Sequence, residues 1–335
     1  MSKVVIIAEA GVNHNGNLQL ARDLIETAKD CGADFVKFQT WKTENIVTRF
    51  AKQAEYQELN TGKSESQYKM LKRLELGFNE FKELKSHCDA AGIAFLSTPD
   101  DWDSAVFLSD LQDTFKVGSG EINNIPFLEK IGTLNKNIYL STGMSTIEEI
   151  QNSLNALTSA GLQKSRITLL HCTSQYPAPF SDINLRAMQS LGEYFDIQVG
   201  YSDHSLGLEV SLGAVALGAR VIEKHFTLDK TMAGPDHSAS LNPEELKKLV
   251  FSIRNLEKSL GDGIKKIEKS EIENRLVVRK SIVANKQIQP GEIFTDSNLT
   301  CKRPGDGMSP SNWHKIIGRA ATQKYEVDDQ ISEPL

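Results

Sequence analysis

Two histidines stand at the ends of two apolar runs that follow each other along the chain. His204 ends the run in "IQVGYSDHS", and His225 ends the run in "VIEKHF". A neutral imidazole is a common metal ligand, and two at neighbouring strand ends could hold one divalent ion. Two ligands leave most of an octahedral shell open for water or substrate. Either histidine alone would be read as a core side chain, but their shared position favours the metal site. His14, in "GVNHNG", is a third candidate ligand.

Two lysines form a second group with chemical potential. Lys37 lies in "FVKFQT" and Lys116 in "FKVGSGE". An unpaired buried ammonium is costly, so each lysine needs an anionic partner. With nearby hydroxyls they could bind a doubly anionic ligand, such as a phosphate plus a carboxylate. The hydroxyls are those of Ser119, Ser141 and Ser202. The alternative is that the two lysines form structural ion pairs with Glu9 and Glu121.

These residues belong to short apolar runs that alternate with helical patterns. Eight runs have the length and apolar composition of β-strands: 4–11, 35–40, 93–99, 115–121, 137–143, 167–174, 197–205 and 221–228. Between them, apolar residues recur at helical spacing, and several such segments end at a glycine, which tolerates a left-handed helix C-cap. Eight strand–helix repeats over about 260 residues predict a (β/α)8 TIM barrel, an α/β fold. The alternative, an open doubly wound sheet, is disfavoured because "EAGVNHNG" lacks the GxGxxG turn.

The alternation of side chains along each strand predicts which of them face the barrel axis. The axis-facing set contains Glu9, Lys37, Gln39, Ser202, His204, Glu223 and His225. Lys224 then faces the helix layer, which the sequence does not explain. Polar residues gather at the carboxyl ends of most strands, where this fold places its active sites.

The chain is predicted to contain two domains. We assign residues 1–262 to the barrel, and within it the long connection 41–79 contains "ESQYKMLKRLEL", which predicts a helix in a lid or insertion. Residues 263–280 are charged and are interpreted as a linker with a solvated helix. Residues 281–335 have short β-like pieces broken by Pro and Gly, typical of a small, mostly β domain.

Composition narrows the class of protein. The 335 residues are 39% hydrophobic and 24% charged, as in ordinary soluble proteins. The formal net charge of -6 gives no indication of the basic surface that nucleic-acid binding proteins need. No apolar run approaches the roughly 20 residues of a membrane helix, and the N-terminal run lacks a basic leader. The four cysteines are scattered without a CxxC pair, which favours reduced thiols in the cytoplasm. We therefore expect a soluble cytoplasmic enzyme.

Several motifs occur in a fixed order along the whole chain. They are "IIAEAGVNHNG", "VKFQT", "KVGSGEINN", "LSTGM", "HCTSQYPAP", "GYSDHS", "VIEKHFTLDKTMAGPDH" and "KRPGDGMSP". Together they resemble the signatures of the sialic acid synthase family, including its members that make legionaminic acid. The C-terminal segment resembles the antifreeze-like (SAF) domain that these enzymes carry.

The resemblance implies roles for individual residues. His204 and His225 match metal ligands, usually occupied by manganese or magnesium. The positions that match phosphoenolpyruvate contacts are Lys37, Thr98, Lys116, Ser119, Ser141 and Ser202. Those that match sugar contacts are Gln39, Glu121, Tyr176, Asp236 and, from the partner subunit of a homodimer with exchanged C-terminal domains, Arg303. Ser174 and Asp100 depart from the residues that many members carry, asparagine and phenylalanine.

The implied reaction is a metal-dependent condensation of phosphoenolpyruvate with an open-chain N-acylated amino sugar, with cleavage of the C–O bond and release of phosphate. The acceptor is N-acetylmannosamine or 2,4-diacetamido-2,4,6-trideoxymannose. Lys37 and Lys116 would position phosphoenolpyruvate, and Glu121 would handle the proton. One alternative is a synthase for a sugar phosphate, which needs further cations that the strand ends do not offer. Another is a non-catalytic protein whose small domain binds carbohydrate or ice, against which the inward lysines, carboxylates and histidines argue.

Overall fold

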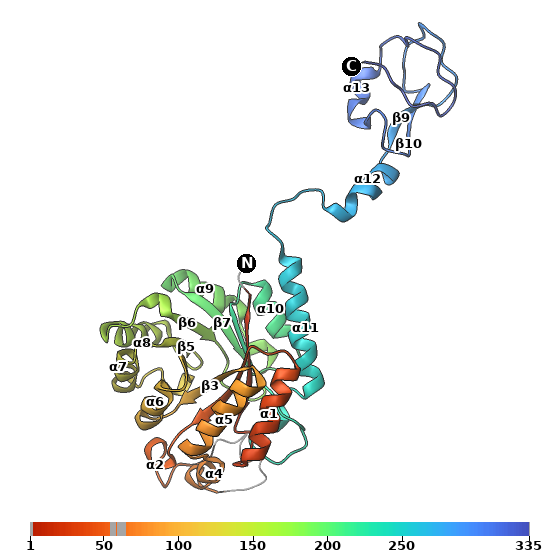
Figure 1. Ribbon diagram of the computed structural model, residues 1–335. Coiled ribbons are helices and arrows are strands. Elements are labelled where there is room, and N and C mark those ends of the chain that lie inside the picture. The colour runs from red at the N-terminus through yellow and green to blue at the C-terminus, as the bar shows by residue number, and fades with distance from the viewer. Residues whose placement is uncertain (1–2, 54–57, 59–64, 335) are drawn as a thin grey trace. The chain divides into compact units, whose positions relative to one another are not determined.

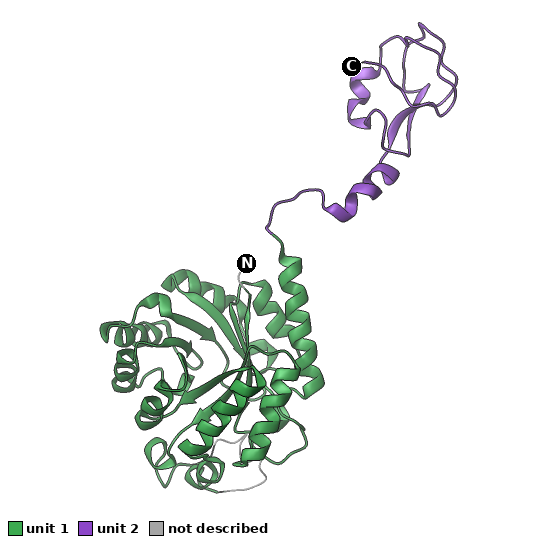
Figure 2. Ribbon diagram, in the orientation of Figure 1, with its two compact units in different colours: residues 1–261 green, residues 262–335 purple. Residues whose placement is uncertain are grey.

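The computed structural model describes residues 3–53, 58 and 65–334. The chain divides into two compact units, Met1–Gly261 and Asp262–Leu335 (Figure 2). The second unit therefore includes the segment that we assigned to a linker. Within the described residues, no helix combines the length and the apolar character needed to cross a membrane.

The first unit is built on eight parallel strands with helices around them (Figure 1). The hydrogen-bonded order is β3-β2-β1-β8-β7-β6-β5-β4, and the two end strands, β3 and β4, lie against each other. The sheet therefore curls into the predicted (β/α)8 barrel. The strands are β1 (Val5–Gly11), β2 (Phe35–Thr40), β3 (Ala94–Pro99), β4 (Thr114–Val117), β5 (Asn137–Ser141), β6 (Ile167–His171), β7 (Gln198–Asp203) and β8 (Val221–His225).

Between β3 and β4, hydrogen bonds from a side chain replace the backbone hydrogen bonds of a strand ladder. The Gln112 amide donates from Nε2 to the Ser97 carbonyl at 2.8 Å, and its Oε1 accepts from the Ser97 N–H at 2.7 Å. Both backbone groups of Ser97 are thereby satisfied inside the protein, where an unpaired one would be costly.

Helices follow the strands and cover the outside of the barrel (Figure 1). They are α1 (Leu18–Asp30), α5 (Phe78–Ala91), α6 (Trp102–Ser109), α7 (Ile125–Thr133), α8 (Ile147–Ser159), α9 (Leu185–Phe195), α10 (Glu209–Ala216) and α11 (Pro243–Leu260). Gly92 and Gly161, predicted to end helices, have φ values of 74° and 99°. These left-handed conformations suit glycine and confirm the C-cap signals.

In its described residues, the insertion between β2 and α5 contains the helices α2 (Thr43–Ile46) and α4 (Gln67–Leu74). The helix predicted from "ESQYKMLKRLEL" is therefore confirmed as α4. Its buried residues Met70 and Leu74 pack with Trp41 and Val12 in a small satellite core. Residues 54–57 and 59–64 of the predicted lid lie outside the described residues.

The interior of the first unit has two apolar layers. The larger layer fills the space between the strands and the helices, and it contains Val36, Phe38 and Tyr201. The smaller lies inside the barrel and consists of Ile7, Leu96, Leu170 and Val221, a set we call the apolar plug. The predicted faces of β1, β2 and β7 are confirmed by this division.

The second unit has a small core of its own. It contains α12 (Ile272–Val278), the antiparallel pair β9 (Ser281–Ala284) and β10 (Leu299–Lys302), and α13 (Trp313–Ile316). Ile282, Phe294, Leu299 and Tyr325 are among the buried residues of its core. Within the predicted linker, residues 263–280, the helix is α12, which begins at Ile272.

Candidate active site at the carboxyl end of the barrel

A cavity of about 400 Å³ opens among the carboxyl ends of the strands. It collects side chains from β1, β2, β3, β4, β5, β7 and β8 and from the loops that follow them. The predicted site residues that line it are Lys37, Gln39, Thr98, Lys116, Ser119, Ser141, Tyr176, Ser202, His204 and His225. The barrel thus brings together residues from near the start of the chain, such as Glu9, and residues as distant in sequence as His225, since β1 and β8 are neighbours in the sheet.

Four buried ionisable side chains form the floor of this cavity. Lys37 Nζ lies 3.1 Å from Glu9 Oε2 and 3.4 Å from Glu223 Oε2. Lys116 Nζ lies 3.7 Å from Glu223 Oε1. The predicted alternative of structural ion pairs is therefore half right: Glu9 is a partner of Lys37, but Glu223 occupies the role that we gave to Glu121. We call Glu9, Lys37, Lys116 and Glu223 the ionic floor.

Burial and neighbouring charges separate the pKa values of the two carboxyls. Burial raises the pKa of Glu9 to about 8, although Lys37 opposes the shift. Burial would also raise the pKa of Glu223, but Lys116 and Lys37 outweigh it, and this pKa falls to about 2. At neutral pH the ionic floor therefore holds one firmly ionised carboxylate and one carboxyl that is mostly protonated.

Hydroxyl groups surround the two lysines. Thr98 Oγ1 lies 3.1 Å from Lys37 Nζ, and Ser202 Oγ donates to Glu223 Oε1 at 2.8 Å. The buried Ser141 Oγ has no hydrogen-bond partner within the described part of the chain. A Cβ added at Gly118 would meet no atom within 4 Å, so this edge of the cavity is open. The arrangement offers donors and space for the oxygens of an anion.

The two histidines face each other across the cavity, with ring centroids 5.6 Å apart. His204 Nδ1 lies 2.7 Å from the Thr173 carbonyl oxygen. A carbonyl can only accept, so Nδ1 carries the proton and Nε2 has a lone pair, 3.2 Å from Tyr176 Oη. Burial lowers the pKa of His204 to about 4 and that of His225 well below its usual range. Both rings are therefore neutral at physiological pH, as metal ligands must be.

Three residues of the first unit that the sequence suggested for the site, Glu121, Asp236 and the candidate ligand His14, do not line the cavity. β4 ends at Val117, and Glu121 lies beyond it in a short 3-10 helix (Ser119–Glu121), where its Oε2 accepts from Asn124 Nδ2 at 2.6 Å. The predicted strand 115–121 is therefore shorter than expected and ends before Glu121, whose role in catalysis stays a prediction.

His14 is not a third ligand in this structure. It is fully buried and packs against Phe38, with ring centroids 6.2 Å apart, and its Nδ1 accepts from the Gly16 N–H. It does not line the cavity. Across the described ranges, no cluster of three or more His, Cys, Asp or Glu side chains has the arrangement of a metal site. In the described part of the chain, His204 and His225 are the two histidines that line the cavity, and their imidazoles could hold an ion.

The remaining predicted sugar contacts lie in different places. Gln39 Nε2 donates to Glu9 Oε1 at 3.1 Å at the edge of the ionic floor. Asp236 lies behind His225, with Oδ2 3.9 Å from the His225 Nδ1, and burial raises its pKa to about 6. Arg303 belongs to the second unit, where its Nε donates to the Val278 carbonyl at 3.1 Å.

The two residues that depart from the family pattern, Asp100 and Ser174, both line the cavity. Burial and the nearby Glu121 raise the pKa of Asp100 to about 7.

The site residues that sequence reasoning did not select are Glu9 and Glu223. Their signal was present, because the pleat places Glu223 on the same face as His225 and Glu9 on the same face as Ile7.

Comparisons with known proteins agree with this fold. A model of the NeuB family matches residues 24–265, and a model of the SAF domain matches residues 279–333. The N,N'-diacetyllegionaminic acid synthase of Campylobacter jejuni subsp. jejuni is 55% identical over 99% of this chain and 100% of its own length. The protein of the same name from Legionella pneumophila subsp. pneumophila is 45% identical over 93% of this chain and 89% of its own.

Among solved structures, the N-acetylneuraminic acid (sialic acid) synthetase of Leptospira borgpetersenii serovar Hardjo-bovis, in complex with citrate, is similar to this chain. It superposes with a TM-score of 0.71 at 35% identity, covering 82% of this chain and 90% of that one. The family match extends over most of the barrel, and the relatives match almost the whole length. This chain belongs to the NeuB family.

Proposed function

We propose that this chain is a nonulosonic acid synthase, which condenses phosphoenolpyruvate with an open-chain N-acylated amino sugar and releases phosphate. Its relatives at 55% and 45% identity are both named N,N'-diacetyllegionaminic acid synthase, which supports 2,4-diacetamido-2,4,6-trideoxymannose as the acceptor. N-acetylmannosamine is the second candidate acceptor. The observation that carries the proposal is the ionic floor, in which two buried lysines share one ionised carboxylate at the open end of a barrel.

The charge of the ionic floor suits an anion with two acidic groups. Glu223 is ionised at neutral pH, whereas a pKa of about 8 keeps Glu9 mostly protonated. Lys37 and Lys116 therefore share a single permanent negative charge, and an incoming anion would favour the charged form of both. Phosphoenolpyruvate presents a phosphate and a carboxylate, and charge-assisted hydrogen bonds from two ammonium groups would fix its orientation.

We propose that His204 and His225 bind a divalent metal ion, manganese or magnesium. Two neutral rings that face one cavity, one with an Nε2 lone pair directed into it, fit this role. When bound there, the ion supplies Lewis acidity toward the aldehyde oxygen of the acceptor. The Thr173 carbonyl, which holds the His204 proton on Nδ1, keeps Nε2 available as a ligand.

In the proposed reaction, C3 of phosphoenolpyruvate attacks the aldehyde carbon, water adds at C2, and the C–O bond to phosphate breaks. One proton of that water ends on the new sugar hydroxyl and the other on the departing phosphate. The ionised Glu223, 2.8 Å from Ser202 Oγ, would stabilise the positive charge that develops at C2. Glu9, which carries a proton at neutral pH, lies where it could donate or accept one, whereas Glu121 would act from the rim.

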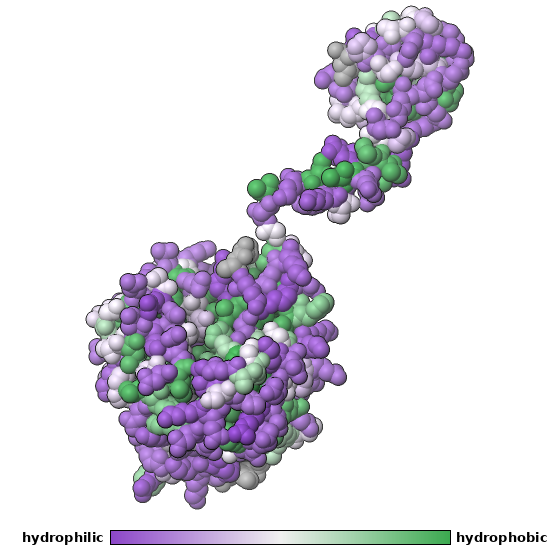
Figure 3. Space-filling model, in the orientation of Figure 1, coloured by the Kyte–Doolittle hydropathy of each residue, from purple (hydrophilic) through white to green (hydrophobic). Residues whose placement is uncertain are grey.

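We further propose that the active unit is a homodimer in which Arg303 of one chain completes the sugar site of its partner. Residues 264–278, at the start of the second unit, expose six apolar side chains, visible as hydrophobic colouring in Figure 3. They are Ile264, Ile267, Ile272, Leu276, Val277 and Val278. A second copy would cover them. The planar guanidinium of Arg303 could donate two hydrogen bonds to an acetamido oxygen or a sugar hydroxyl.

Subunit complementation tests the dimer. A His204→Ala chain and an Arg303→Ala chain, each inactive alone, are mixed and allowed to exchange subunits. One barrel of the mixed dimer then has both histidines and receives an intact arginine, so part of the activity returns. A mixture that exchanges subunits and stays inactive would contradict the shared site.

A sugar-phosphate acceptor fits the cavity less well. A second phosphate needs its own cations, and among the described residues that line the cavity only Lys37 and Lys116 are lysines or arginines.

We also propose a cytoplasmic location, because Cys31, Cys88, Cys172 and Cys301 are all free thiols.

A phosphate-release assay tests the proposed reaction. Purified protein is given phosphoenolpyruvate, Mn²⁺ and each acceptor in turn: 2,4-diacetamido-2,4,6-trideoxymannose, N-acetylmannosamine and N-acetylmannosamine 6-phosphate. We expect the largest kcat/KM with the diacetamido sugar and the smallest with the sugar phosphate. Release with none of the three would overturn the proposal, and release with the sugar phosphate alone would support the alternative acceptor.

A further inference from the structure

At their carboxyl ends, strands β7 and β8 present two successive ladder pairs on opposite faces of the sheet, followed by the histidines His204 and His225. Ser202 pairs with Glu223, and Asp203 pairs with Lys224, in the register of the ladder. The first pair points into the cavity, the second toward the helices, and His204 and His225 point into the cavity again. The second pair therefore lies directly between two pairs of site residues, on the opposite face.

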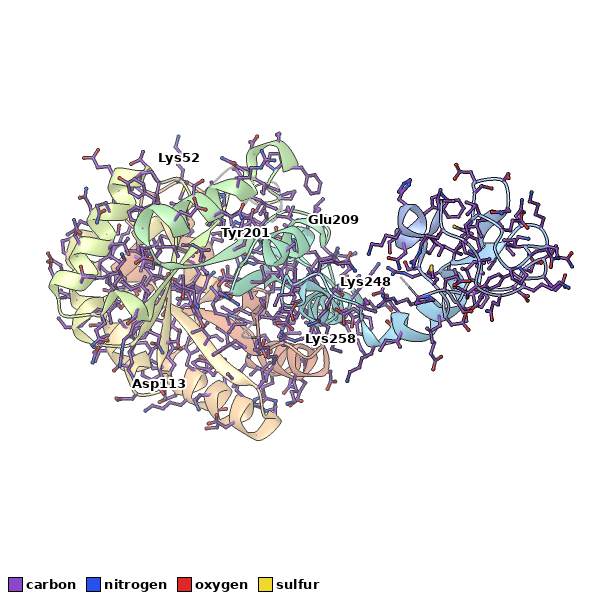
Figure 4. All side chains as sticks on the ribbon, turned by 90° about the horizontal axis from the view of Figure 1, so that it is seen from above. Lys52, Asp113, Tyr201, Glu209, Lys248 and Lys258 are labelled. Atoms are coloured by element: carbon purple, nitrogen blue, oxygen red, sulfur yellow. The ribbon has the colours of Figure 1, made fainter. Side chains whose placement is uncertain are left out.

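Asp203 and Lys224 form a fully buried ion pair. Lys224 Nζ lies 2.8 Å from Asp203 Oδ2, and the two side chains are 2% and 0% exposed. Tyr201, on the same face of β7, is likewise buried within the unit (Figure 4). Both charges make further hydrogen bonds: Asp203 accepts from the Ser211 hydroxyl of α10 and from the hydroxyl and N–H of Ser205, and Lys224 donates to the Ser205 carbonyl.

These contacts fix the backbone on both sides of His204. β7 ends at Asp203, so no ladder partner is recorded for His204 itself. The residue before it carries the carboxylate, and the residue after it has its N–H held by Asp203 at 2.9 Å and its carbonyl held by Lys224 at 2.6 Å. Because Lys224 is the residue directly before His225, the same ion pair also fixes the other histidine.

Stability alone does not account for this ion pair. Taking two charges out of water costs several kcal/mol per ion, and well-packed apolar side chains of similar volume are often at least as stabilising. The surrounding layer is apolar and could accept such residues. What an ion pair with directional hydrogen bonds adds is a defined geometry, which apolar packing specifies less strictly.

We propose that Asp203 and Lys224 are positioning residues for the histidine pair. Their ion pair clamps the carboxyl ends of β7 and β8 so that the rings of His204 and His225 keep the separation and orientation needed to bind one metal ion. The metal part of this inference rests on the function proposed above, whereas the effect of the clamp on ring geometry does not.

The test uses a variant in which both charges are removed and most hydrogen bonds are kept, Asp203→Asn with Lys224→Gln. The single variant Lys224→Gln serves if the double variant fails to fold. The matched control is Asp34→Asn with Arg254→Gln, which neutralises another ion pair (2.6 Å) at the amino end of the barrel. His204→Ala identifies signals that belong to the metal site.

Two readouts separate positioning from stability. The first is the NMR signal of the His204 Nδ1–H in protein with ¹⁵N-labelled histidine, measured without metal. We expect faster exchange and broadening of this proton in the double variant and no change in the control. The second is the Kd for Mn²⁺, measured by the electron paramagnetic resonance of free Mn²⁺. We expect an increase of at least about tenfold in the double variant, a change typical of groups that orient metal ligands.

The outcomes distinguish the clamp from the metal site. An unchanged Nδ1–H signal in a folded variant would overturn the clamp, whatever the metal does. A changed signal with an unchanged Kd for Mn²⁺ would overturn its role in metal binding. If wild-type protein and His204→Ala bind Mn²⁺ equally, the proposed metal site fails, and the NMR result alone decides whether the clamp orients the histidines.

Discussion

The interior of the barrel changes character within two residues along its strands. Toward the amino end the inward side chains form the apolar plug, in which Ile7 is fully buried and Val221 is 2% exposed. Two residues further along the same strands stand Glu9 and Glu223, which are 1% and 3% exposed. The two layers are almost equally buried, yet one is apolar and the other is ionic.

The difference indicates what each layer is for. Burying an aliphatic side chain stabilises the fold by about 1.5–3 kcal/mol, whereas burying an ion costs several kcal/mol before its partners compensate. Buried charges with widely separated pKa values are characteristic of functional sites. The apolar plug therefore holds the barrel together, and the ionic floor with its histidines is the layer that we propose binds ligands.

The largest effect is expected from removing a histidine above the ionic floor. His204→Ala should weaken Mn²⁺ binding by more than about 100-fold and abolish most turnover, because one of two protein ligands is lost. The unfolding temperature should change little. Titration with Mn²⁺ and steady-state assays measure both, and His87→Ala, a partly exposed histidine beside Glu26, is the control. Full turnover of His204→Ala after exhaustive chelation would contradict the assignment.

The apolar plug should respond in the opposite way. Leu170→Ala removes a fully buried side chain from it and should lower the free energy of unfolding by about 2–5 kcal/mol. The KM for phosphoenolpyruvate should stay within about twofold of wild type, since Leu170 does not line the cavity. Chemical denaturation and kinetics on one preparation give the two values. A large rise in the KM for phosphoenolpyruvate without loss of stability would contradict the assignment of a purely structural role to the apolar plug.

A smaller effect follows from the pKa of Glu9. This pKa is raised to about 8, so the neutral form persists up to that pH and a new negative charge appears beside Lys37 as the pH rises through it. The KM for phosphoenolpyruvate should therefore increase several-fold between about pH 7.5 and 9. Glu9→Gln should flatten this rise, while Glu121→Gln, outside the cavity, should leave it in place. Identical profiles for wild type and Glu9→Gln would show that another group titrates.

Periodicity in the sequence predicted the fold and the faces of the strands. The alternation in "FVKFQT" assigned Lys37 to the inside and Phe38 to the helix layer, and both are confirmed. Eight strand–helix repeats are compatible with few folds other than the (β/α)8 barrel. In that barrel the carboxyl ends of the parallel strands meet at one edge. These inferences depend on local spacing, which a single sequence contains.

Pairing between strands was harder to predict, because it depends on register and on where each strand stops. Glu223 became the partner of Lys116 only because β8 and β4 face each other across the barrel, which no local pattern records. Glu121 lies outside β4 because this strand ends at Val117, four residues earlier than the run 115–121 indicated. Lys224, unexplained from the sequence, is neutralised by Asp203 on the neighbouring strand.

The central claim is that the ionic floor binds phosphoenolpyruvate, and calorimetric titration of this ligand into the protein tests it most directly. Wild type, Lys116→Ala and Lys136→Ala are compared without acceptor. Lys136 pairs with Asp113, which lies at the periphery of the first unit (Figure 4). We predict that Lys116→Ala weakens binding by about 10- to 100-fold, through loss of a charge-assisted contact, and that Lys136→Ala binds like wild type. Equal affinity for all three proteins would contradict the account.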